Sequence, residues 1–226
     1  MRRVGYWVSG ILLLTMSSSG ASLCMNGSLA SYIALGATGC TIGSNTVYDF
    51  QTVSGTAGAT PIATLDVTIQ PSGGSLTPEL SMSLRASASA NTELETIFTY
   101  RISGNSYIGS MITLSGSSET GDGGVTDVQT FCAGGTFGPD GLTGCTGSPG
   151  TLLTLDGVQN QDSTALGPAG VLSITDDLVL DGGLAGSASG GAFADQFTAV
   201  PEPLEILLAG LGLALIVGSR VARFKK

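Results

Sequence analysis

The chain has 226 residues, 35 of them glycine, and a formal net charge of −9. From Ser22 to Val200, two arginines stand against fifteen acidic residues, a net charge of −13 that repels a phosphate backbone, so the sequence predicts no nucleic-acid partner. Histidine is absent, which removes the commonest general base and the commonest transition-metal ligand; we therefore expect no enzyme and no metal or other cofactor.

The first 21 residues predict a secretory signal peptide. Arg2 and Arg3 give a basic start, an apolar stretch runs from about Val4 to Met16, and small residues follow up to Ala21. The apolar stretch is too short to cross a hydrocarbon layer of roughly 30 Å comfortably. We expect a signal-peptide helix at 1–21 and export of the remaining chain.

Residues 22–199 predict a single β-rich exported domain. In the run 64–70, Leu65, Val67 and Ile69 share one face and polar residues share the other, which is the period of a strand. Similar short runs lie at 79–86, 94–102, 108–114, 125–131, 151–155, 171–174 and 178–180. Turn residues separate them, and this pattern favours a mainly β fold, an antiparallel β-sandwich of jelly-roll-like type.

Four cysteines in an exported chain predict two disulfides. The candidates are Cys24, Cys40, Cys132 and Cys145. Three pairings are open, and the local ones, Cys24 with Cys40 and Cys132 with Cys145, cost the least loop-closure entropy. Close C-x-x-C pairs are absent, so the sequence does not favour a metal site made of thiolates.

Several aspartates are candidates for calcium ligands. They are Asp122, Asp127, Asp176, Asp177 and Asp181. Their spacing matches neither an EF-hand loop nor a glycine-aspartate nonapeptide repeat, and we interpret them as solvated acids in turns. A hydrolase would need two acids that converge in a pocket, and the sequence assigns no catalytic residue.

The last segment, 200–226, combines three features in a fixed order. Pro201, Glu202 and Pro203 precede an apolar run, Leu204 to Ala222, which as a helix would be about 28 Å long at 1.5 Å per residue and just able to span a membrane. A basic cluster closes the chain, formed by Arg220, Arg223, Lys225 and Lys226. Under the positive-inside rule this cluster predicts a cytoplasmic C-terminus.

This order of triplet, apolar helix and basic end resembles the PEP-CTERM sorting signal of Gram-negative bacteria. The resemblance implies that an exosortase, a membrane-embedded transpeptidase, recognises the triplet and processes the tail, and that the C-terminal transmembrane helix anchors the protein transiently in the inner membrane. It also implies export to the cell envelope and an association with exopolysaccharide and biofilm. The two prolines suit this role because they hold the triplet extended and outside the helix that follows.

The leading hypothesis is therefore a non-enzymatic, exported protein of the cell surface or exopolysaccharide matrix. The alternative is a carbohydrate-binding or calcium-dependent adhesion module with the same signal peptide and C-terminal sorting signal.

Overall fold

The computed structural model describes residues 21–200 of the chain. Its helical segments are α1 (Leu29–Ile33) and the 3-10 turn η1 (Gly36–Thr38). Its strands are β1 (Ser22–Leu23), β2 (Gly27–Ser28), β3 (Cys40–Ile42), β4 (Asn45–Val53), β5 (Thr60–Pro61), β6 (Val67–Gly73), β7 (Pro78–Leu84), β8 (Ser87–Ser89), β9 (Glu93–Ser115), β10 (Ser118–Thr120), β11 (Gly124–Ala133), β12 (Ser148–Leu155), β13 (Gln161–Asp181), β14 (Ser187–Ser189) and β15 (Ala192–Val200).

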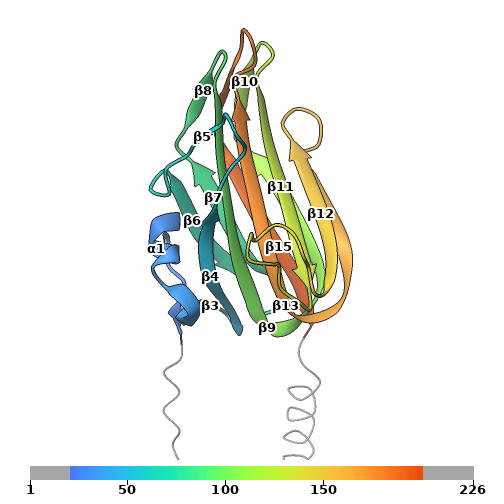
Figure 1. The fold of residues 1–226 in the computed structure, drawn as a ribbon. Helices are drawn as coiled ribbons and strands as arrows, with labels where there is room; N and C mark the ends of the chain where they lie inside the picture. Colours follow the sequence, from blue (N-terminus) through green and yellow to red (C-terminus); the bar gives the residue numbers. More distant parts are fainter. Residues whose placement is uncertain (1–20, 201–226) are drawn as a thin grey trace, which may run out of the picture.

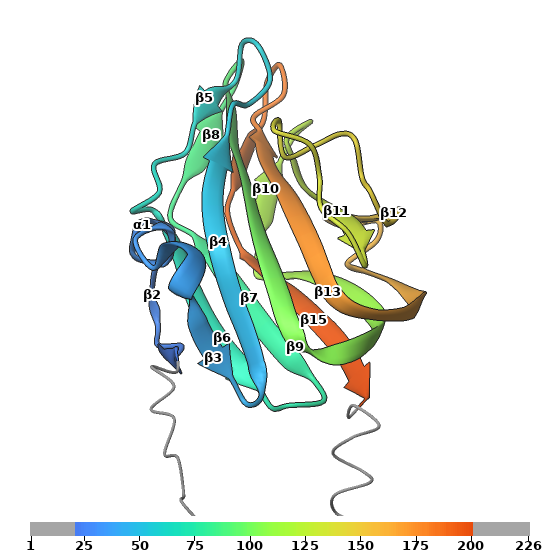
Figure 2. The same cartoon turned by 60° about the horizontal axis from the view of Figure 1, so that its bottom comes forward.

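The fold is mainly β, as the sequence predicted. Twelve strands form one sheet with the order β1-β3-β4-β9-β15-β7-β6-β2; β13, β11 and β12 continue it from β9, and β5 also pairs with β9. The sheet curls over on itself into a sandwich-like pair of facing layers (Figures 1 and 2). Its neighbours are antiparallel except for two short pairs, β1 with β3 and β5 with β9.

Strands β9 and β13 belong to both layers. The first half of β9 pairs with β4 and its second half pairs with β15, while β13 accompanies it on the other side. Between the halves, Gly104 has a φ of 117°, and a Cβ there would lie 2.3 Å from the carbonyl oxygen of Ser44. Only glycine permits this bend.

The sequence predicted two strands, at 94–102 and 108–114, where the structure has the single strand β9. That prediction was wrong because Gly104 bends the strand and does not reverse it. The runs 171–174 and 178–180 were likewise predicted as separate, and both lie in the single strand β13, which continues through residues 175–177.

The core fills the space between the layers through strand alternation. Along β7 every second residue is buried, so that Leu80, Met82 and Leu84 point inward. From the opposite layer, Phe50 stacks on Tyr100 with ring centroids 5.0 Å apart. These contacts supply the apolar burial that drives folding.

A buried polar network ties the chain together where β9 bends. The side-chain nitrogen of Asn45 donates to the carbonyl oxygens of Ile42 at 3.1 Å and Ser75 at 3.0 Å. Its Oδ1 accepts from the Tyr107 hydroxyl at 2.8 Å and from the Asn105 amide at 2.9 Å. Asn45 is thus buried with both ends of its amide satisfied, as a stable interior requires.

Both disulfides predicted from the sequence are present. Cys24 bonds to Cys40 and Cys132 bonds to Cys145, the local pairing. Disulfides of this kind are typical of oxidising compartments outside the cytoplasm.

The described segment begins and ends at the same end of the molecule (Figure 1), and the small sheet of β8, β14 and β10 lies at the opposite end. Within residues 21–200 no helix is long and apolar enough to cross a membrane. The predicted signal peptide, sorting motif, transmembrane helix and basic cluster lie outside these residues, so they remain predictions.

Candidate binding groove

A bulge in β4 shapes the first wall of the candidate site. Tyr48 pairs with Arg101 and Gln51 pairs with Thr99, so two residues of β4 stand opposite one residue of β9. Asp49 occupies the bulge with a φ of 56°, a left-handed conformation that is uncommon outside glycine, asparagine and aspartate. The extra residue turns Phe50 into the core while Asp49 stays on the outer face.

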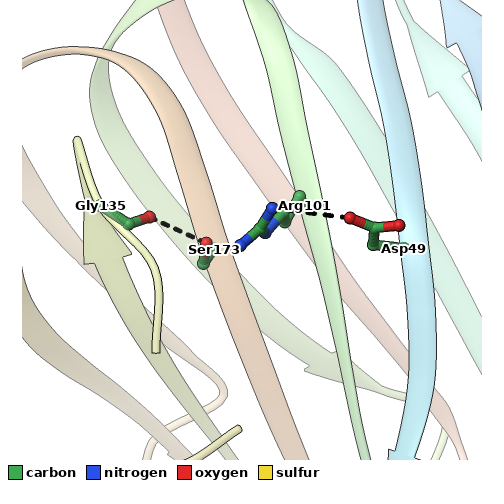
Figure 3. A network of polar contacts seen from close by, with 4 residues as sticks. All are labelled: Asp49, Arg101, Gly135 and Ser173. Atoms are coloured by element: carbon green, nitrogen blue, oxygen red, sulfur yellow. Dashed lines mark hydrogen bonds and ion pairs between the residues drawn. The ribbon is translucent and has the colours of Figure 1, made fainter. Parts of the chain in front are cut away.

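Arg101 of β9 lies beside this bulge and pairs with Asp49. The distance from its Nη1 to Asp49 Oδ2 is 3.5 Å, with the two side chains 35% and 28% exposed. In Figure 3, Arg101 lies between Asp49 of β4 and Ser173 of β13. Such a partly exposed pair adds little stability. A guanidinium carries several N–H donors, and the ion pair with Asp49 involves Nη1, so the other donors can serve a ligand.

The loop between β11 and β12 forms the opposite wall. Ser173 Oγ donates to the carbonyl oxygen of Gly135 at 2.9 Å, and Thr175 Oγ1 donates to that of Gly141 at 2.5 Å. A Cβ on Gly141 would lie 2.8 Å from Thr99 Cγ2, so the loop approaches the sheet closely. The Cys132–Cys145 disulfide closes the base of this loop.

Asp140 gives the tip of the loop its shape. Its Oδ1 accepts from the backbone nitrogens of Leu142 at 3.1 Å and Thr143 at 3.0 Å, and its Oδ2 accepts from the Thr143 hydroxyl. These hydrogen bonds, first of all the one from the Thr143 side chain, lower the pKa of Asp140. The carboxylate therefore stays ionised and organises the turn.

Between the walls lies a groove of about 620 Å³, which we call the Arg101 groove. Its polar lining comes from Asp49, Gln51, Arg101, Asp140 and Ser173, and its apolar lining includes Phe137 and Leu142. Arg101 supplies donors only, Asp49 supplies acceptors, and Gln51 supplies both. An aromatic ring beside such a set can bind the apolar face of a ligand whose edges are hydroxylated.

A second cavity, of about 380 Å³, adjoins this groove through Thr52, Val53 and Ser54. The carboxylate of Glu95 lines it and holds the neighbouring loop, because it accepts from the backbone nitrogen of Thr56 and from its hydroxyl. The half-buried carboxyl of Asp177 lies close to Glu95. Burial and then the charge of Glu95 raise the pKa of Asp177 to about 6.

Two of the candidate turn acids lie where the sequence interpretation put them. Asp122 is exposed and accepts from the backbone nitrogens of Leu184 and Ala185, at 2.8 Å and 3.0 Å, which lowers its pKa. Asp181 is exposed and accepts from the backbone nitrogen of Gly183 at 2.8 Å. Both act as ordinary turn residues.

The interpretation was wrong for Asp177, which lies half-buried within β13 and not in a turn, and for Asp127 and Asp176, which are 1% and 0% exposed inside the core. Both face inward because each occupies an alternate position among buried residues of its strand, Asp127 between Val125 and Phe131 and Asp176 among the leucines and isoleucine of β13. Asp195 of β15 is buried with them. None of the three lines either cavity, so they do not form the open acid pair that a hydrolase needs.

Sequence reasoning missed the groove. The available signal was that Arg101 is one of only two basic residues between Ser22 and Val200. Nothing in the spacing of Asp49 or Phe137 places them beside it.

Within residues 21–200, no group of three or more acidic or cysteine side chains is arranged to hold a metal ion. No family model matches the chain. No curated protein matches it either. A solved structure of the carbohydrate-binding module TmCBM61, in complex with β-1,4-galactotriose, is 11% identical, covers 55% of this chain and 71% of that one, and has a TM-score of 0.27. At so low a score the likeness carries no argument about function.

Proposed function

We propose that the chain is an exported, non-enzymatic protein of the cell surface or polysaccharide matrix, and that its domain binds glycans in the Arg101 groove. The observation that carries the proposal is the Asp49–Arg101 pair. A residue held in a left-handed conformation at a bulge places a carboxylate next to one of the two arginines of the domain, on the outer face and in a groove. Unusual backbone conformations of this kind cluster at functional sites.

The chemistry of the groove fits sugar hydroxyls. Each hydroxyl donates one hydrogen bond and accepts others, so a sugar edge needs donors and acceptors side by side. Arg101 and Asp49 provide that combination at 3.5 Å from each other, with Gln51 on the same strand as Asp49. Phe137 on the facing loop offers the apolar contact that a pyranose ring needs.

Charge favours an uncharged glycan over an acidic one. The segment from Ser22 to Val200 carries a net charge of −13. Inside the groove, Arg101 is outnumbered by Asp49 and Asp140. A uronate-rich polysaccharide would meet repulsion that a neutral one does not.

Binding of the purified full chain, in non-ionic detergent, to neutral and uronate-rich polysaccharides tests this proposal. Arg101→Ala removes the donors, and hydrogen bonds to a charged group are worth about 1.5–3 kcal/mol, so affinity for a neutral glycan should fall at least about tenfold. Arg85→Ala is the matched control, because Arg85 is exposed outside the groove. Equal affinity of the Arg101→Ala and Arg85→Ala variants would show that the glycan does not bind in the Arg101 groove. Loss of binding in the presence of a chelator would favour calcium-dependent adhesion.

The curled double layer supports a jelly-roll-like sandwich as the carrier of this groove. For the tail we propose the PEP-CTERM role: Pro201 to Pro203 are recognised by an exosortase, the apolar run stops in the inner membrane, and the basic end fixes the orientation. Replacing Pro201, Glu202 and Pro203 with alanine should leave the unprocessed precursor in the membrane fraction. Unchanged processing would contradict the sorting role and leave the glycan proposal standing.

A further inference from the structure

Three carboxyl groups meet in the interior of the fold without any basic partner. Asp127 of β11, Asp176 of β13 and Asp195 of β15 are each at most 1% exposed. An ionised carboxylate in such surroundings is costly unless it is paired or hydrogen-bonded. The question is what neutralises this acid cluster.

Hydrogen bonds cannot do so if all three groups are ionised. Both oxygens of Asp127, both of Asp176 and Oδ1 of Asp195 then have no donor. Two uncharged groups of the interior are also unpaired, the Gln129 amide nitrogen and the Thr154 hydroxyl, both 0% exposed. The Tyr100 hydroxyl donates to Asp195 Oδ2 at 2.5 Å, and the neutral Gln129 side chain, which lies near Asp176 and Asp195, favours their charged forms without cancelling the effect of burial.

The elements around the cluster bring no positive charge. β9 contributes Tyr100 and the uncharged Ser110, whose hydroxyl donates to Gln129 Oε1 at 2.7 Å. β12 contributes Thr154, and Leu80 of β7 stands opposite Asp195 in the register. The charge of Asp177, beside Glu95, acts on Asp127 and adds to the repulsion.

The two arginines of this part of the chain are elsewhere. Arg101 lies in the groove on the outer face, and Arg85 is exposed after β7. Among residues 21–200 no group of three or more acidic or cysteine side chains, this cluster included, is arranged to hold a metal ion.

We infer that the acid cluster retains protons in the folded protein. Asp127 and Asp176 stay protonated at neutral pH and hold the two layers together around Asp195. When Asp176 is protonated, its carboxyl group can donate a hydrogen bond to Asp195, which two ionised carboxylates could not form. Asp195 then accepts from both Tyr100 and Asp176, across the two layers.

The direction of each pKa shift agrees with this geometry. Burial, followed by the charges of Asp195 and Asp177, raises the pKa of Asp127 well above its ordinary value. Burial, followed by the charges of Asp195 and Asp127, does the same to the pKa of Asp176. Burial raises the pKa of Asp195 only to about 6, because the Tyr100 hydrogen bond favours its charged form. Asp195 is therefore the first of the three to ionise.

Proton linkage gives the direction in which the stability of the fold changes with pH. In the unfolded chain all three carboxyls have a pKa near 3.8, so above that value folding takes up protons. The contribution of the three carboxyls to stability is fully present below their pKa in the unfolded chain. It is lost as the pH rises through their pKa values in the folded protein. The fold should thus be most stable under acidic conditions and loosen under alkaline ones, which is the reverse of a protein held by salt-bridged carboxylates.

Urea-dependent pulse proteolysis of the full chain in non-ionic detergent, from pH 5 to pH 8, tests the inference. The unfolding equilibrium constant of the wild type should rise about a hundredfold for each pH unit, because Asp127 and Asp176 each retain a proton that contributes a factor of ten. Asp176→Asn is a neutral isostere and should reduce that slope by about tenfold per unit and raise the stability at pH 8. Asp181→Asn, on an exposed turn, should leave the slope unchanged.

Two further measurements decide the matter if the variant does not fold. Asp127→Asn should also reduce the slope, and the infrared spectrum of the folded wild type at pH 7 should show the carbonyl band of a protonated carboxylic acid that disappears in urea. A flat or rising stability from pH 5 to pH 8, or no such band, would overturn the inference. Strong stabilisation by calcium chloride at pH 8 would do so too, because the cluster would then be a cation site.

Discussion

The hydroxyl of Tyr100 on β9 lies 2.5 Å from Oδ2 of Asp195 on β15, and this hydrogen bond joins the two layers of the fold inside the core. Burial, with the charge of Asp195 next, raises the pKa of Tyr100 well above its ordinary value, so the phenol remains a donor at any physiological pH. The Tyr100 ring also stacks on Phe50. One side chain therefore couples the aromatic core to the acid cluster.

Tyr100→Phe should destabilise the protein by about 2 kcal/mol at pH 7, because it leaves a buried carboxyl without its donor. It should also raise the pKa of Asp195 above about 6. Denaturation at several pH values measures both effects. Tyr32→Phe is the control: its hydroxyl donates to the partly buried Met25 carbonyl at 2.9 Å, and its loss should be smaller and independent of pH in this range.

Asn45→Ala should cost about 3 kcal/mol, because it leaves the Tyr107 hydroxyl and the Ser75 carbonyl oxygen in the interior with fewer partners. Chemical denaturation at pH 7 measures the loss. Asn160→Ala, at an exposed position, should change stability by no more than about 0.5 kcal/mol. Similar losses for both variants would show that the network at the bend adds nothing.

Gly104→Ala should destabilise the fold by about 3 kcal/mol, since the φ of 117° and the approach of the Ser44 carbonyl oxygen both exclude a Cβ. Gly170→Ala is matched in chemistry but has open space around it, and it should be close to neutral. Thermal unfolding compares the two. Equal melting temperatures would mean that β9 does not need a glycine to pass between the layers.

The two disulfides should separate stability from binding. Each closes a loop of similar length, 16 and 13 residues apart in sequence, so removing either by Cys→Ser changes should cost about 3 kcal/mol. Only loss of Cys132–Cys145 frees the loop that carries Phe137 and Asp140, so only that variant should lose glycan affinity at temperatures where both are folded. Loss of affinity in the Cys24–Cys40 variant as well would point to a general effect of destabilisation.

The sequence predicts the β class and the disulfides because both depend on local patterns. Alternation exposes one face and buries the other in β6 and β7, and cysteine number with spacing favours local pairs. It does not predict β4, because the bulge at Asp49 breaks the alternation between Tyr48 and Phe50. Bulges are settled by what the neighbouring strand can pair with, and that information is not local.

The interior acids could have been found from the pattern. Asp176 shares its strand face with Leu172, Ile174, Leu178 and Leu180, which are all 0% exposed, so alternation alone places it inside. The residue type favoured an exposed position, because aspartates without a partner are seldom buried. The groove had no such signal, since Asp49, Arg101 and Phe137 come from separate elements that only the fold brings together.

The chain enters and leaves the described domain at one end, while the sheet of β8, β14 and β10 caps the other. If Val200 leads into a membrane anchor, that cap becomes the part with the greatest reach from the membrane. Its outer ladder consists of short hydroxyl side chains, with Ser118 and Ser189 2.6 Å apart and Thr120 and Ser187 2.8 Å apart. A reporter tag inserted at this cap would therefore be the first point of the protein that an antibody or a neighbouring cell meets.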